Sequence, residues 1–162
     1  MRYASLPLLL LTLAGCSREK APDATALPSP TPARVAQGEL QHLSFLHGNW
    51  RGQAVGGGAP FYERYVALDD STLQSYTFPD STFSTPADSG QIRWINGQVR
   101  SGSGSVTWVA TLWTPDSVRF DPEHGVRNSF IWIRQTPDSW QARLETSSTV
   151  PATVYDMTRL TR

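Results

Sequence analysis

This chain of 162 residues is poor in cysteine, lysine and histidine, with one, one and three copies respectively. Because Cys16 is the only thiol, no intrachain disulfide can form, and the usual zinc sites built from several cysteines are excluded. Nucleic-acid binding relies on clustered Lys and Arg, but Lys20 is the only lysine and the arginines are spread singly. We therefore expect no nucleic-acid partner and a fold stabilised by packing alone.

Long apolar runs are also missing. The longest, Leu6–Ala14, has about nine residues, under half of the roughly 20 that span a bilayer as a helix. Arg2 precedes this run, and Leu13-Ala14-Gly15-Cys16 ends it. A charged start, a short apolar core and a small-residue cleavage site predict a secretory signal. Leu-Ala-Gly-Cys resembles the lipobox of bacterial lipoproteins.

The resemblance implies that Cys16 is acylated and becomes the mature N-terminus. Lipoproteins of this type carry three acyl chains, and two or more chains anchor a protein stably, so the membrane is an expected partner. Ser17 stands where an inner-membrane retention signal would often have Asp. We expect a bacterial cell-envelope protein on the periplasmic face of the outer membrane rather than the inner membrane. The alternative is a plain signal peptide cleaved elsewhere.

Composition divides the chain into a signal, a tether and one domain. The predicted signal covers 1–15. Residues 16–37 contain four prolines and no aromatic residue, which is typical of a disordered tether. Residues 38–162 hold all six tryptophans and have the size of one domain with its own core.

This domain is predicted to be all-β, with one short helix in front. Gly38 to His47 carries leucines three residues apart, and Gly48 is expected to end the helix. After it the apolar period changes to two, as in Trp140-x-Ala142-x-Leu144. About ten strands are expected, near 49–55, 60–68, 72–78, 91–95, 98–102, 106–114, 117–121, 127–135, 139–146 and 153–161. Many short, evenly spaced strands indicate an antiparallel β-barrel or sandwich.

A barrel is favoured by resemblance. Phe45-Leu46-His47-Gly48-Asn49-Trp50-Arg51-Gly52 is similar to the opening of several lipocalin-like bacterial barrel families. The stretches 120–124, 130–134 and 140–145 resemble one uncharacterised family of exported lipocalin-like proteins. That family reads Phe-x-x-Pro-x-His-x-Phe-Pro, then Ile-x-Tyr. This chain has Gly125-Val126 for Phe-Pro and Trp132 for Tyr. The resemblance runs from Leu40 to Arg159 and implies a lipocalin-like fold, not an activity.

The same resemblance implies a structural pair at the closure of the barrel. Lipocalins commonly place an arginine of the last strand over the Trp of Gly-x-Trp. We therefore expect Arg159 to lie within about 6 Å of the Trp50 ring centre.

Two residues are candidates for polar chemistry. Glu63 shares a strand face with Phe61 and Tyr65, and a carboxylate on an aromatic face is costly to bury unless it is paired. It is predicted to be a polar anchor in a cavity, with Tyr65 and Arg134 as candidate partners. The alternative is that this face points outward, because a one-residue slip reverses a strand.

His124 lies in a loop, at the His of the resembling family. It could contact a ligand, bind a metal or haem, or act as a general base, or it could simply bond to loop backbone. No spacing typical of zinc ligands or of a nucleophile elbow occurs, so no metal, no cofactor and no catalytic residue is predicted.

The sequence thus predicts a lipid-anchored barrel that binds a small apolar or amphipathic molecule. Small barrels can hold one ligand in a mostly apolar pocket. The expected ligand-binding residues are Glu63, Tyr65, Trp94, Trp108, His124 and Arg134. The alternatives are a filled barrel with a structural or interaction role, and an enzyme that uses His124 or Glu63 in the cavity.

Overall fold

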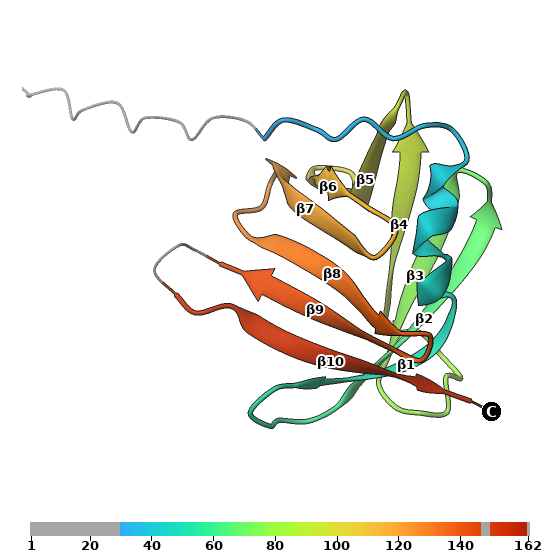
Figure 1. Ribbon diagram of the computed structural model, residues 1–162. Helices are drawn as coiled ribbons and strands as arrows, with labels where there is room; N and C mark the ends of the chain where they lie inside the picture. The colour runs from blue at the N-terminus through green and yellow to red at the C-terminus, as the bar shows by residue number, and fades with distance from the viewer. Residues whose placement is uncertain (1–29, 147–149, 162) are drawn as a thin grey trace, which may run out of the picture.

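The computed structural model describes residues 30–146 and 150–161, which form a closed antiparallel barrel of ten strands with one short helix (Figure 1). The all-β barrel predicted from the sequence is confirmed. The elements are η1 (Glu39–Leu46), β1 (Gly48–Ala54), β2 (Phe61–Asp69), β3 (Thr72–Phe78), β4 (Asp88–Ile95), β5 (Gln98–Ser103), β6 (Val106–Trp113), β7 (Ser117–His124), β8 (Ser129–Thr136), β9 (Ser139–Glu145) and β10 (Thr153–Leu160).

Each strand pairs with the next one in sequence, and β1 pairs with β10 to close the barrel. The closing register runs from Asn49 opposite Leu160 to Ala54 opposite Tyr155. Tight turns support the local pairs. Asn96 and Gly97 join β4 to β5 with φ values of 52° and 79°, the positive angles that a type I′ turn requires.

The short helix η1 is a 3-10 helix, and the three-residue spacing of its leucines fits that geometry. A 3-10 helix has three residues per turn, so Leu40, Leu43 and Leu46 lie on one face, and all three are buried in the core. Gly48 does not end the helix as expected. His47 is the C-cap, and Gly48 opens β1 at φ 113°. That positive φ favours glycine, and a Cβ at this position would in addition lie 2.8 Å from Arg159 Nη1.

Bulges shift the two-residue alternation inside β6. A strict two-residue alternation would place Leu112 on the same face as Trp108 and Ala110. The β6–β7 register shifts between Ala110 and Leu112. Ala110 is buried and Trp113 packs against the core, whereas Leu112 is 44% exposed. The extra residue of the bulge therefore turns Trp113, not Leu112, into the barrel.

The chain in front of η1 lies on the outside of the barrel. Ala33 N–H donates to Ala110 O at 2.7 Å, and Val35 N–H donates to Gly97 O at 3.0 Å. Val35 is 2% exposed and belongs to the hydrophobic core. The predicted tether, 16–37, therefore ends in a segment that packs on the barrel. Cys16, the predicted signal 1–15 and the rest of the tether to residue 29 lie outside the described residues.

None of the described helices is long and apolar enough to cross a bilayer.

Candidate ligand-binding cavity

The barrel has a closed end and an open end. The strand directions place η1, the start of β1 and the β8–β9 turn at one end, and the β1–β2 and β7–β8 connections, the end of β9 and the start of β10 at the other (Figure 1). We call these the closed end and the open end.

Trp50 fills the closed end. It is fully buried, and its indole Nε1–H donates to Leu46 O at 2.6 Å. The Arg159 guanidinium carbon lies 4.3 Å from the Trp50 ring centre, so the predicted stack is present. The same guanidinium donates to Phe45 O at 3.0 Å and to Asp138 Oδ1 at 3.0 Å. Arg159 therefore joins η1, β10 and the β8–β9 turn over one indole face.

The open half of the barrel contains a cavity of about 290 Å³. This is close to the lower limit of small-molecule pockets, roughly 300 Å³. Its lining comes from β2, β6, β8, β9 and β10. The lining residues are Phe61, Glu63, Tyr65, Trp108, Phe130, Trp132, Trp140, Ala142, Arg143, Leu144, Tyr155 and Met157.

The register explains why these side chains meet. Within a strand, alternate residues face the lumen, and residues opposite each other on paired strands share a face. Glu63 lies opposite Trp50, which is buried in the core. Phe61, Glu63 and Tyr65 therefore point inward. This settles the question that the sequence left open for strand 60–68.

Glu63 is a carboxyl group among aromatic rings. It is partly buried, and Tyr65 Oη donates to its Oε2 at 2.8 Å. Burial raises the pKa of Glu63, and the hydrogen bond from Tyr65 partly opposes that rise. Burial and the adjacent carboxylate raise the pKa of Tyr65 well above its ordinary value, so this phenol stays protonated and remains a donor.

Tyr65, Trp132 and Trp140 form a set of edge-on rings. Their centroids are 5.9 Å (Tyr65–Trp132), 6.1 Å (Tyr65–Trp140) and 5.7 Å (Trp132–Trp140) apart. The series continues through Phe130, 5.3 Å from Trp132, to Trp108, 5.6 Å from Phe130. Each contact adds roughly 0.5–1.5 kcal/mol beyond area burial, so the wall of the cavity is held in place by ring packing.

Trp140 also carries a buried donor without an acceptor. Its residue is 1% exposed, and its Nε1–H has no hydrogen-bond partner among the described residues. Trp140 lies between the two halves of the lumen, because it lines the cavity and stacks edge-on against Trp50 at 5.9 Å.

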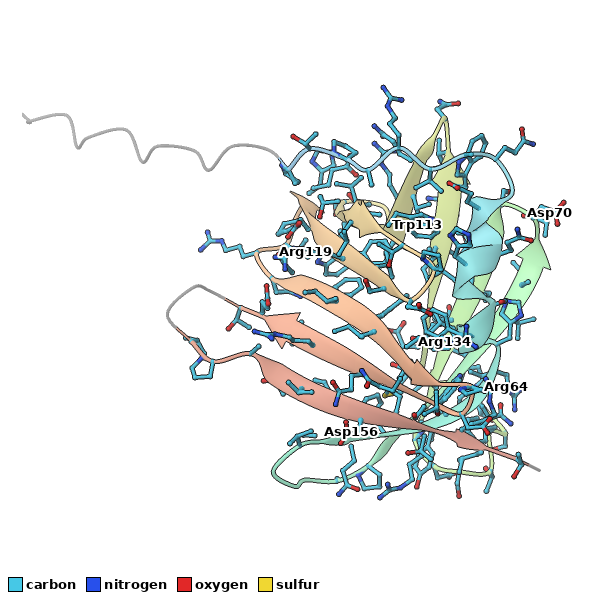
Figure 2. All side chains as sticks on the ribbon, in the orientation of Figure 1. Arg64, Asp70, Trp113, Arg119, Arg134 and Asp156 are labelled. Carbon is cyan, nitrogen blue, oxygen red and sulfur yellow. The ribbon has the colours of Figure 1, made fainter. Side chains whose placement is uncertain are left out.

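Three of the predicted ligand-binding residues come together and three lie elsewhere. Glu63, Tyr65 and Trp108 line the cavity. Trp94 instead donates from Nε1 to Val35 O at 2.8 Å and so binds the segment in front of η1. Arg134 is exposed, and Figure 2 shows it beside the closed end. The predicted Glu63–Arg134 pair does not form within the described chain, since Tyr65 is the partner of Glu63.

His124 lies at the end of β7, is exposed, and is not part of the cavity lining. Its neighbour Glu123 faces the outside, where it binds Arg100 with an N–O distance of 2.9 Å. That hydrogen bond lowers the pKa of Glu123. His124 and Glu63 therefore do not converge in one pocket.

The sequence suggested that Trp132 and Trp140 line or plug the barrel, but the expected ligand-binding set included no cavity residue of β8, β9 or β10. The signal was available, because Trp140, Ala142 and Leu144 form the clearest alternating face in the chain. What was missing was the register that sets this face opposite Glu63 across the lumen. Within the described ranges, 30–146 and 150–161, no cluster of three or more His, Cys, Asp or Glu residues could hold a metal ion.

Comparison with known proteins assigns no family to this chain. No family model and no curated protein matches the chain. One similar solved structure is a redesigned beta barrel, b11L5F_LGL, at 12% identity and a TM-score of 0.37, covering 80% of this chain and 100% of that one. Another is EF1p2_mFAP2b bound to DFHBI, at 12% identity and a TM-score of 0.35, covering 77% and 100%.

Proposed function

We propose that this protein is a lipid-anchored barrel of the bacterial cell envelope that binds one small apolar or amphipathic molecule in the cavity of its open half. The observation that carries the proposal is the cavity of about 290 Å³, walled by aromatic rings and containing the carboxyl group of Glu63. Ligand sites are typically apolar pockets with a few polar groups that fix orientation.

The cavity also argues against a purely structural barrel and against an enzyme that uses His124. A barrel with a purely structural role needs no internal space, and empty space in a core costs stability. An enzyme that uses His124 in the cavity is disfavoured because His124 is not in the lining, whereas the alternative that uses Glu63 keeps its residue in the cavity.

A pair of neighbouring variants tests the binding site. Ala142 lines the cavity, whereas Gln141 bonds to Asp156 on the outer face. Ala142→Leu should fill part of the cavity and weaken binding of the uncharged fluorescent probe N-phenyl-1-naphthylamine by about tenfold or more. Gln141→Leu, the matched control on the same strand, should leave it unchanged. Equal affinity in wild type and both variants, or no binding at all, would contradict the proposal. Native mass spectrometry of the purified domain would look for a molecule that co-purifies.

The anchor has its own test. Cys16→Ser should prevent incorporation of labelled palmitate and shift the protein from the membrane fraction to the soluble fraction, or leave an uncleaved precursor. Ser17→Ala is the control that keeps the acylation site. Normal processing and membrane association of Cys16→Ser would rule out the anchor, and the ligand site would be unaffected.

A further inference from the structure

The cavity contains one acidic group, Glu63, and within residues 30–146 and 150–161 its hydrogen-bond partner is the uncharged Tyr65. Arg143 is the other charged residue in the lining. It is exposed, and its Nε lies 3.2 Å from Glu145 Oε1. Arg134, the partner predicted from the sequence, is exposed and lies at the closed end. Glu63 therefore has a neutral partner, Tyr65, in place of a counter-charge.

The walls around this carboxyl favour positive charge. The faces of Trp, Tyr and Phe rings carry negative potential, and a cation within about 6 Å of a ring centroid is attracted to it. Tyr65, Trp132 and Trp140 lie within about 6 Å of one another and line the same cavity as Glu63. A positive group bound here would be attracted both by the Glu63 carboxylate and by the aromatic rings.

The remaining walls are apolar. Phe61 packs edge-on against Tyr155 at 5.4 Å, and Trp108 against Phe130 at 5.6 Å. These rings can surround a hydrocarbon or aromatic body. An anion would meet the opposite conditions, because the carboxylate and the ring faces both repel it.

We propose that the cavity selects an amphipathic organic cation, with its ammonium group at the Glu63 carboxylate and its apolar body among the aromatic side chains. This inference rests on the proposed ligand-binding function and specifies the class of ligand. The raised pKa of Glu63 is consistent with it, since burial without a counter-charge disfavours the ionised form and a bound cation would restore it. The unpartnered Trp140 Nε1–H is a donor that a ligand oxygen could also use.

Three probes of similar shape test the charge preference. They are the 2-naphthylethylammonium ion, 2-naphthylethanol and the 2-naphthylacetate anion, titrated calorimetrically at neutral pH. Wild type should bind the ammonium ion at least about tenfold more tightly than the alcohol, and the anion most weakly. Glu63→Gln keeps an acceptor for Tyr65 but removes the charge, and should abolish the preference for the ammonium ion while leaving binding of the alcohol within about twofold. Asp156→Asn removes one charge from the outer face and is the matched control.

The outcomes separate the two proposals. If wild type bound the ammonium ion and the alcohol equally, or if Glu63→Gln kept the preference for the ammonium ion, the proposal of a cationic ligand would be wrong. Binding of the alcohol would in that case still support the cavity as a ligand site. An alcohol affinity that Ala142→Leu does not change, with no binding of the ammonium ion, would overturn both. A preference lost in Glu63→Gln and kept in Asp156→Asn is the result expected.

Discussion

Two buried tryptophans of the lumen, Trp50 and Trp140, differ in whether their polar and aromatic groups have partners. At the closed end, Trp50 is fully buried and has its Nε1–H bonded and its ring covered by Arg159. At the boundary between the two halves, Trp140 is also buried, but its Nε1–H has no partner among the described residues, and the ring borders the cavity. Trp50 therefore belongs to the part of the barrel that maintains the fold, whereas Trp140 offers an unused donor beside the cavity.

The largest expected effect is at the closed end. Trp50→Ala should lower the free energy of unfolding by about 3–5 kcal/mol, because it removes a large buried ring, a hydrogen bond and a cation–π contact. Urea denaturation followed by far-UV circular dichroism would measure it. The control Leu68→Ala changes a 55% exposed side chain and should stay within about 0.5 kcal/mol. A small loss in Trp50→Ala would mean that the closed end does not carry the stability.

Arg159→Lys should have the next largest effect, a loss of about 1–2 kcal/mol in the free energy of unfolding. Lysine keeps the charge but cannot stack a planar group on Trp50 while bonding Phe45 O and Asp138. Arg134→Lys, at an exposed site, is the matched control. Equal melting curves for the two variants would show that the charge alone is sufficient at position 159.

Glu63→Gln should raise stability at neutral pH, because glutamine has no ionised form that burial would disfavour. The pKa of Glu63 is raised in the folded protein, so the folded state is destabilised when this carboxyl group ionises as pH rises through that pKa. Below the pKa in the unfolded chain, about 4.3, the group is protonated in both states and the free energy of unfolding is not reduced. Glu63 faces Tyr65 on β2, Trp50 on β1 and Thr77 on β3, which are uncharged. Arg143, the charged residue in the same lining, is exposed and pairs with Glu145.

The stability difference between Glu63→Gln and wild type should therefore shrink as pH falls toward 4. Thermal unfolding of ligand-free protein across this range would follow it. If the variant were instead less stable than wild type at neutral pH, a counter-charge for Glu63 would have to exist in the barrel.

The smallest expected effect is that of His124→Ala. The side chain is exposed and outside the cavity lining, so stability should change by less than about 0.5 kcal/mol and probe affinity by less than about twofold. The same fluorescence titration used for Ala142→Leu would detect a change. A clear loss of affinity would extend the ligand site to the end of β7.

Local patterns predicted the elements well, and the site only in part. Turn residues such as Asn96-Gly97 and the alternation in 139–146 depend on nearby residues alone, so the strands agreed closely with the structure. The lumen side of β2 depends on register with β1, which the sequence of β2 does not contain. Trp94 resembles a cavity residue by type. Only the path of the chain over the barrel shows that it binds Val35.

The pairing of β1 with β10 has a consequence for how this chain folds. Every other ladder in the barrel joins strands that follow one another, so it can form as a hairpin soon after its residues are available. The closing ladder joins Asn49 to Leu160 across nearly the whole domain, and such distant contacts slow folding because the loop entropy is lost before the contact is gained. Until that last step, Trp50 has no Arg159 above it and both edge strands are open. The slowest folding phase should therefore report the burial of Trp50.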